Sequence, residues 1–287
     1  MGRVTTRVPR VRVDLAQGTR VARADTVAVE EPLEIRVAGE PVVTTMRTPG
    51  ADFDLALGHL LTEGLLPQSS GVAAMMHCTD EDASGAPTFN VVEVTLAPGA
   101  GPLTAARRRS ETMTSACGVC GSETIADTLT RVPHDLAGDP VRLDPQLLIA
   151  LPEALREHQG AFDRTGGVHA AGIFSSGGEA LVVREDVGRH NAVDKAIGAL
   201  SRTQELPLKG RILVVSARAS FEIIQKAAVA GIPVVVAVGA PTSLAVALAT
   251  ELGMTLVAFT RSPTCSVYAG EARLIPGRPE DPAATVR

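Results

Sequence analysis

The sequence predicts an α/β (α+β) fold in two domains, and three observations carry this prediction. In the C-terminal third, short apolar runs alternate with helical segments in the order strand, helix, strand, helix, strand. Residues 33–96 have the pattern of strands around one long helix. Residues 97–110 are rich in Pro, Gly and Arg, which is typical of a linker. We therefore expect a smaller β-rich domain at 1–105 and a larger domain with a partly parallel sheet at 106–287.

Composition excludes several classes of function. With 287 residues, 45% of them hydrophobic, the chain is long enough to bury a substantial core. Its net charge of -5 offers no overall positive field to nucleic acid or anionic membranes. The longest apolar run, 231–249, is divided by Pro233, Gly239 and Pro241, and the N-terminus lacks the apolar segment of a secretory signal. We expect a cytoplasmic protein with no nucleic-acid partner and no membrane partner.

The first region is predicted to combine a hairpin, a helix and a further strand. Residues 33–37 and 42–46 form the hairpin, and residues 89–96 form the later strand. Asp52 is predicted to cap a helix that runs through Leu61. Most of this region is therefore expected to be sheet.

The middle of the chain contains a charged corner. Residues 144–156 begin with Asp-Pro and are predicted to form a helix. Residues 184–195 then hold seven ionisable side chains at a strand-to-helix corner, where Asn191 is the expected helix cap. His190 and His169 are candidates for moving protons near neutral pH. The alternative for His169, which lies on an apolar strand, is a satisfied core residue.

The C-terminal third is predicted to form a βαβαβ unit. Strands are expected at 211–216, 233–238 and 255–259, and helices at 220–230 and 243–252. Right-handed crossovers make the strands parallel and bring the three loops that follow them to one sheet edge, where ligands of open α/β sheets bind. Arg218, Thr242 and residues 260–264 occupy these loops. Arginines, hydroxyls and helix N-termini suit phosphate or a nucleotide, and solvated surface loops are the alternative.

Cys117 and Cys120 lie in the stretch MTSACGVCGSE at 113–123. Ser122 is predicted to cap a helix, so the two thiols precede a helix N-terminus, where backbone N–H groups and the helix dipole favour the thiolate. Glycines on both sides leave the backbone free to expose the thiols. These features indicate nucleophilic sulfur.

Three chemistries compete for this cysteine pair. A structural zinc site needs two more ligands, and neither His77-Cys78 nor Cys265 has a spacing that identifies them. A thioredoxin-like dithiol normally lies early in a small domain after a strand, whereas this pair follows a basic linker. A persulfide carrier would use one thiolate to accept sulfane sulfur and pass it on.

Four motifs in fixed order resemble those of the FdhD family of formate dehydrogenase accessory sulfurtransferases. They are SACGVCG at 115–121, GGVHAAG at 166–172, REDVGRHNAVDK at 184–195 and AGIPVVVAVGAPTSLAV at 230–246. The resemblance runs from about residue 33 to Tyr268 and implies a cytidine-deaminase-like fold in the larger domain. Zinc deamination is not expected, because Ala170 and Ala171 follow His169 where a deaminase has its H-x-E signature. We expect no metal site.

The resemblance also implies a function. Cys117 would carry the persulfide and Cys120 would assist or resolve it, with a cysteine desulfurase as donor. The acceptor would be the molybdenum bis(molybdopterin guanine dinucleotide) cofactor, abbreviated Mo-bisMGD, of the formate dehydrogenase catalytic subunit. The alternative is a non-catalytic chaperone of this cofactor, and we expect a homodimer because a carrier must meet two partners.

The nucleotide of this cofactor, or GDP or GMP as its mimic, is expected at the strand-end loops. Residues 259–264 match the family's cofactor-contacting segment. The loop pattern adds Arg218 and Thr242, and the charged corner adds His190. The expected contacts are Phe259, Thr260, Arg261, Ser262, Pro263, Thr264, Arg218, Thr242 and His190.

Overall fold

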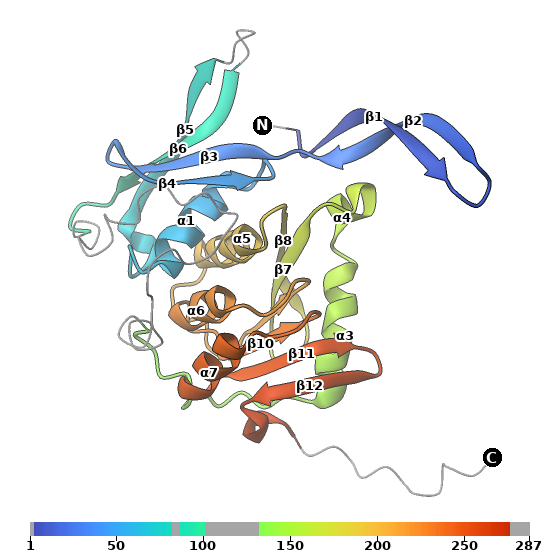
Figure 1. The fold of residues 1–287 in the computed structure, drawn as a ribbon. Helices are drawn as coiled ribbons and strands as arrows, with labels where there is room; N and C mark the ends of the chain where they lie inside the picture. The colour runs from blue at the N-terminus through green and yellow to red at the C-terminus, as the bar shows by residue number, and fades with distance from the viewer. Residues whose placement is uncertain (1–2, 82–86, 101–131, 276–287) are drawn as a thin grey trace, which may run out of the picture.

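The computed structural model describes residues 3–81, 87–100 and 132–275, and they form a mixed α/β fold (Figure 1). The predicted fold class is therefore confirmed. The predicted boundary near residue 105 falls outside the described residues, and the division into two domains stays a prediction. Among the described helices, none is long and apolar enough to cross a bilayer.

The described strands form three sheets. β1 (Thr5–Asp14) and β2 (Thr19–Ala28) make an antiparallel hairpin. A four-stranded sheet has the order β4-β3-β6-β5, with β3 at Glu31–Val37, β4 at Glu40–Arg47, β5 at Val72–Glu81 and β6 at Pro87–Leu96. The predicted 33–46 hairpin and 89–96 strand are confirmed within it.

The third sheet contains the predicted βαβαβ unit. Its order is β12-β11-β10-β9-β7-β8, with β7 at His169–Phe174, β8 at Ala180–Asp186, β9 at Ile212–Val215, β10 at Val234–Ala237, β11 at Thr255–Arg261 and β12 at Thr264–Ala269. β9, β10 and β11 are parallel, as predicted, and β7 runs antiparallel to β9. The sequence prediction missed β12, a half-exposed edge strand antiparallel to β11.

Helices cover both faces of this sheet. Alternate residues of a strand point to opposite faces, so each central strand contributes to two hydrophobic cores. Leu213 and Val215 of β9 share a core with α1 (Asp52–Thr62), α5 (Arg189–Ser201), α6 (Phe221–Val229) and α7 (Ser243–Glu251). Ile212 and Val214 pack instead with α3 (Pro145–Arg156). Figure 1 shows α3 on the side of the sheet away from α6 and α7. The other helical segments of the described residues are α4 (Gly160–Thr165) and two 3-10 turns, Ser69–Gly71 and Glu271–Arg273.

The helix predicted to start at Asp144-Pro145 is confirmed, whereas the helix cap predicted at Asp52 is wrong. Asp144 caps α3, because its side chain accepts a hydrogen bond from Gln146 N at 2.8 Å. Asp52 does not cap α1, since Ala51 occupies the N-cap position with a left-handed φ of 54°. The Asp52 carboxylate is buried and binds the Arg47 guanidinium, with Nε to Oδ1 at 3.1 Å. An ion pair from the neighbouring strand has replaced local capping.

The predicted cap at Asn191 is also wrong. Gly188 is the N-cap of α5, and Asn191 lies inside the helix. The Asn191 side chain is buried, donates to Met46 O at 2.7 Å and reaches Thr45 Oγ1 at 3.2 Å. A buried amide needs hydrogen-bond partners, and β4 supplies them.

Candidate functional site

The three strand-end loops meet at one edge of the six-stranded sheet, as the sequence predicted. Backbone hydrogen bonds join them in series: Gly239 N donates to Ala217 O at 3.1 Å, and Phe259 N donates to Gly239 O at 3.1 Å. Ala219 N also donates to Ala240 O at 3.1 Å. The edge is therefore held by main-chain contacts and does not depend on which side chains the loops carry.

The structure brings two further segments to this edge. Because β7 is antiparallel to β9 and β8 is antiparallel to β7, the first residue of β7, His169, and the corner after β8 both lie at the edge. The N-terminus of α5 joins those of α6 and α7 there. Three helix N-termini at one edge create a field that favours anions.

A cavity of about 660 Å³ opens at this edge, and we call it the strand-end cavity. Its walls come from the strand ends and from the helices α3 and α4. The lining residues are Ile149, Pro152, Glu153, Leu155, Arg156, Gln159, Phe162, Gly166, Gly167, Val168, His169, Ser216, Val238, Thr260, Arg261 and Ser262. This volume lies within the range of small-ligand and cofactor sites. The sequence predicted the helix at 144–156 but not its place in this wall.

Three of the predicted contact residues line the cavity: Thr260, Arg261 and Ser262. Thr260 is 1% exposed, and its hydroxyl has no hydrogen-bond partner among the described residues. A buried hydroxyl without a partner costs free energy, which a ligand able to pair with it would recover. Arg261 is exposed at the end of β11 and carries the charge of this segment.

The other predicted residues lie outside the cavity lining. Phe259 is 51% exposed and has a positive φ of 49°, a strained conformation for a bulky residue. Thr242 caps α7, because its hydroxyl accepts from Ala245 N at 3.3 Å. Arg218 is exposed in the loop after β9, Pro263 lies in the β11–β12 turn, and Thr264 is the first residue of β12. The expected loop at 260–264 is thus mostly strand.

His190 lies in the first turn of α5, beside the edge, and faces the start of α6. Its Nε2 is 3.3 Å from Ser220 Oγ and 3.7 Å from Glu222 Oε2. Burial and the charges of Arg189 and Lys226 lower the pKa of His190 to about 4. His190 is therefore neutral at pH 7, contrary to the expectation that it titrates near neutrality.

His169 shows the same tendency. Burial, followed by the charge of Arg189, lowers the pKa of His169 below its usual range. Both histidines can accept or donate hydrogen bonds at neutral pH, but neither supplies a fixed positive charge. Positive charge near the edge comes from arginine.

Most of the charged corner at 184–195 has a structural role. Arg184 binds Asp54 Oδ2 at 2.9 Å, and Glu185 accepts from Ala161 N at 2.8 Å at the start of α4. Asp186 and Lys195 form a buried pair at 2.6 Å. Most of the charged side chains that suggested a functional cluster therefore form structural ion pairs or hydrogen bonds.

Asp194 binds Lys226 at 2.9 Å, which leaves Arg189 and His190 as the members of the corner that bear on the site. The Nε of Arg189 is buried and has no partner within the described part of the chain. Arg189 is not singled out by the sequence patterns above, although its position at the start of a predicted helix is a signal that the sequence offers. It is the fixed cation beside both histidines.

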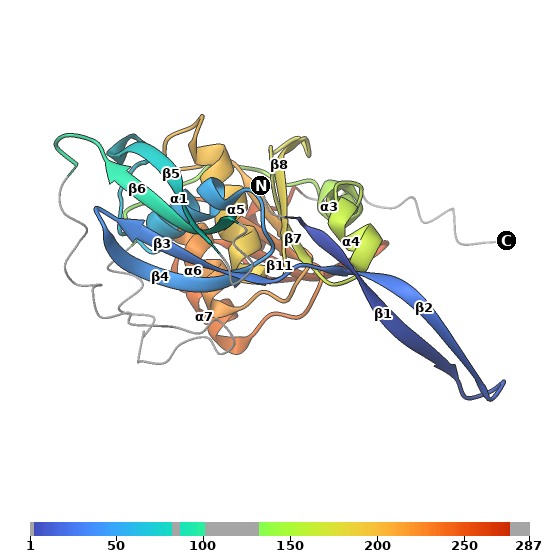
Figure 2. The same cartoon turned by 90° about the horizontal axis from the view of Figure 1, so that it is seen from above.

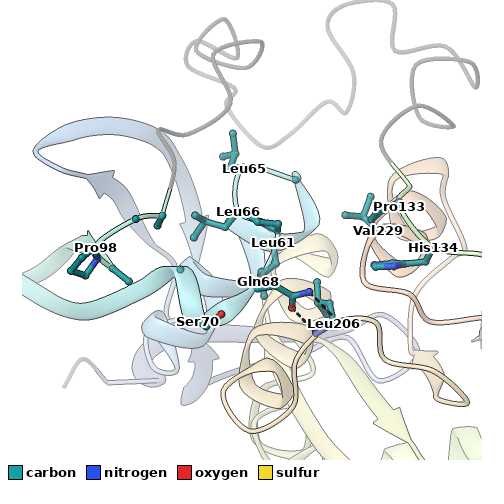
Figure 3. A pocket seen from close by; sticks show the side chains of 16 residues that line it. Leu61, Leu65, Leu66, Gln68, Ser70, Pro98, Pro133, His134, Leu206 and Val229 are labelled. Atoms are coloured by element: carbon teal, nitrogen blue, oxygen red, sulfur yellow. Dashed lines mark hydrogen bonds between the residues drawn. The ribbon is translucent and has the colours of Figure 1, made fainter.

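Cys117 and Cys120 lie outside the described residues. The chain on either side of them borders a second cavity of about 650 Å³, the amino-edge cavity (Figure 3). Ala97 to Ala100 line it before the gap, and Pro133 and His134 line it after the gap. Leu206, which precedes β9, is also in the lining and exchanges two hydrogen bonds with the Gln68 side chain, at 3.0 and 3.1 Å. This cavity therefore lies at the sheet edge opposite the strand-end cavity.

Among the described residues, no three His, Cys, Asp or Glu side chains lie close enough together to hold a metal ion. The described part of the chain therefore gives the zinc alternative no support. Cys78 and Cys265 are free thiols, on β5 and β12. His77 lies beside Asp52, with Nε2 3.8 Å from Oδ2.

Comparison with known proteins identifies the family. The sequence profile of the FdhD/NarQ family matches residues 28–275. Proteins named sulfur carrier protein FdhD are 48% identical in Streptomyces avermitilis, over 96% of this chain and 97% of theirs, and 49% identical in Mycolicibacterium paratuberculosis, over 91% and 96%. A crystal structure of a proposed formate dehydrogenase accessory protein from Desulfotalea psychrophila shares the fold, with a TM-score of 0.71 at 20% identity, covering 95% of this chain and 100% of that one. With the profile matching most of its length, the chain belongs to the FdhD/NarQ family.

Proposed function

We propose that this protein carries sulfur from a cysteine desulfurase to Mo-bisMGD for formate dehydrogenase. Cys117 is the persulfide carrier, and the strand-end cavity holds a guanine nucleotide part of the cofactor. The naming of the relatives as sulfur carriers supports the first statement. The second is supported chiefly by one observation: the buried, unpartnered hydroxyl of Thr260 in a nucleotide-sized cavity at the ends of parallel strands.

The chemistry of loading is a thiol exchange. The Cys117 thiolate attacks the terminal sulfur of the donor persulfide, a new S–S bond forms, and the donor cysteine leaves as a thiolate. No oxidant is needed, because the sulfane sulfur keeps its oxidation state.

Delivery of sulfide requires two electrons, and Cys120 supplies them. Its thiol attacks Cys117 at the persulfide bond, forms a Cys117–Cys120 disulfide and releases hydrosulfide to the molybdenum of the substrate. A cellular dithiol then reduces the disulfide. Cys120 is accordingly the resolving thiol.

The strand-end edge contributes binding and orientation. Arg261 offers paired N–H donors to a phosphate, and the three helix N-termini add main-chain N–H groups. Thr260 donates its hydroxyl proton to the ligand. Neutral His169 in the wall can hydrogen-bond without adding charge.

Loading is tested by mass spectrometry after incubation with a desulfurase and cysteine. We expect a one-sulfur adduct on the parent protein and on Cys120→Ala, and none on Cys117→Ala. A Cys117→Ala protein that still gains sulfur would overturn the carrier assignment. An unloaded parent protein that nevertheless binds GDP would identify a cofactor chaperone instead.

Nucleotide binding is tested by titration calorimetry with GDP. Arg261→Ala and Thr260→Val each remove a donor worth on the order of 1 to 3 kcal/mol, so we expect affinity to fall about tenfold to a hundredfold. Thr260→Val should leave the melting temperature equal or higher, because it removes an unpaired buried hydroxyl. Arg142→Ala, at an exposed arginine outside the cavity lining, is the control. Undiminished GDP affinity in both site variants would remove this edge from the mechanism, while sulfur loading should survive in either case.

A further inference from the structure

The strand-end cavity has two walls that differ in chemistry. One wall is the end of the sheet, where Thr260 supplies a hydroxyl and Arg261 an exposed guanidinium. The other, which we call the α3–α4 wall, comes from the two helices and the turn that joins them. Figures 1 and 2 show α3 and α4 together on the side of β7 away from α5. The residues of this wall used below are Glu153, Arg156, Gln159 and Phe162.

The α3 part of this wall carries a carboxylate and no free cation. The lining positions 149, 152, 153 and 156 are spaced so that they share one face of the helix. Glu153 is exposed on this face. Arg156 is occupied, because it pairs with Asp163 and its guanidinium lies over the Phe162 ring, 4.9 Å from the centroid. The wall therefore disfavours a phosphate and suits the uncharged part of a ligand.

Gln159 adds a buried amide to the same wall. It is 4% exposed and occupies the N-cap position of α4, yet its side chain makes no capping hydrogen bond. Glu185 of β8 caps the helix instead, because its carboxylate accepts from Ala161 N and from Phe162 N, both at 2.8 Å. The amide of Gln159 is thus not committed to the helix. A side-chain amide combines an acceptor with two N–H donors, a pattern that can pair with the edge of a base.

The carboxylate of Glu153 favours one purine over the other, because a carboxylate only accepts hydrogen bonds. Guanine presents two donors side by side, N1–H and the 2-amino group, which match the two oxygens of a carboxylate. Adenine presents the lone pair of N1 at the same place, so a carboxylate there repels it. Hypoxanthine keeps N1–H but lacks the amino group, and is expected to bind between the two.

We propose that the α3–α4 wall is the base subsite of the strand-end cavity and that Glu153 selects guanine, with Gln159 as a second contact to the base. Arg261 then holds the phosphates at the opposite wall. This inference rests on the proposed nucleotide site. It adds the direction in which the nucleotide lies and the residue that determines its specificity.

Titration calorimetry of the full-length chain with GDP, inosine diphosphate (IDP) and ADP tests the assignment. The parent chain should bind GDP about tenfold more tightly than ADP, with IDP between them. Glu153→Gln replaces one acceptor oxygen by an N–H donor that suits adenine N1. The ratio of the ADP dissociation constant to that of GDP should therefore fall about tenfold.

Gln159→Leu tests the second contact, because it removes the amide at similar size. We expect GDP affinity to fall about threefold to tenfold. The melting temperature of the ligand-free chain should not fall, since Glu185 still caps α4. A lower melting temperature with unchanged GDP affinity would give Gln159 a structural role and overturn its assignment to the base.

Glu157→Gln is the matched control for Glu153→Gln. It makes the same change of charge one helical turn later, at an exposed residue outside the cavity lining, and should leave all three dissociation constants unchanged. Arg261→Ala should weaken GDP, IDP and ADP by the same factor, because the phosphates are common to them. An unchanged ratio in Glu153→Gln, with binding still weakened in Arg261→Ala, would overturn the base subsite alone. A parent chain that binds none of the three nucleotides would overturn the nucleotide site as well.

Discussion

At the scale of single residues, His190 shows how its surroundings reverse an expectation drawn from residue type. Burial is the largest cause of its lowered pKa, and the cations Arg189 and Lys226 act in the same direction. Glu222 and Asp194 oppose them and are outweighed. The imidazole therefore stays neutral throughout the physiological range.

This pKa makes stability depend on pH. The pKa of His190 falls from an ordinary 6.5 to about 4 in the folded protein, so between these values the unfolded chain binds a proton that the folded chain does not. The stabilising contribution is complete above pH 6.5 and is lost as the pH falls toward 4. In His190→Gln, we expect the decrease in unfolding free energy between pH 7 and pH 5 to shrink by about 1 kcal/mol, allowing for partial exposure.

Urea unfolding at the two pH values measures this difference. His158→Gln, at an exposed histidine beyond the end of α3, serves as the control. If His190→Gln loses as much stability as the parent chain on acidification, the imidazole is not the responsible group.

At the scale of elements, the crossing of α1 and α5 brings the first part of the chain onto the helical layer of the large sheet. Gly58 and Gly198 permit this crossing, because an added Cβ would lie 1.8 Å from Asp194 O at Gly58 and 1.9 Å from Asp54 O at Gly198. Both contacts are to backbone atoms, which cannot rotate away. The helices therefore approach each other through their main chains.

Gly198→Ala should separate these two helices. Overpacking of a core typically costs about 1 to 3 kcal/mol, and we expect at least the upper end because backbone must move. The variant should also loosen the pairing of Asp54, on α1, with Arg202 at the end of α5, where Nη1 and Oδ1 are 3.3 Å apart. Chemical denaturation measures the change. Gly160→Ala is the control, since its added Cβ would meet only Arg164 Nη1 at 4.0 Å, and an equal loss in both variants would point away from the crossing.

At the scale of the whole molecule, the described residues on both sides of the predicted domain boundary share one hydrophobic core. Leu33 and Leu57 belong to the same buried cluster as Ala196 and Val235. A buried ion network accompanies it: Lys226 Nζ lies 2.9 Å from Asp194 and 2.9 Å from Glu63 Oε1. Burial alone would raise the pKa of Asp194, but Lys226 and His59 outweigh it and lower it to about 2.

Because the core and the ion network are continuous, we expect one cooperative unfolding transition in scanning calorimetry, with equal calorimetric and van't Hoff enthalpies. Lys226→Met removes the ammonium partner of the buried Asp194 carboxylate, which should cost about 3 to 5 kcal/mol and lower that single transition as a whole. Lys209→Met, at an exposed lysine, should leave it in place. Two separate transitions in the parent protein would support two independently folding domains.

Local sequence determined the parts of this fold that depend on neighbours along the chain. The βαβαβ unit follows from short apolar runs alternating with helices, and right-handed crossovers then place its loops at one edge whatever surrounds them. Asp144 caps its helix because the acceptor and the donor lie two residues apart. The strand-end position of Thr260 and Arg261 was predictable for the same reason.

Tertiary structure alone decided the rest, because the deciding partners are remote in sequence. Asp52 binds buried Arg47 and does not cap its helix, and Asn191 donates a hydrogen bond to Met46 of β4. A buried polar group must form hydrogen bonds with the groups that pack around it. The wall that α3 and α4 add to the strand-end cavity depends on which face of the sheet they cover. The lowered pKa of His190 likewise depends first on burial, then on its neighbour Arg189 and on Lys226 from α6. Burial and the position of Lys226 are set by tertiary packing.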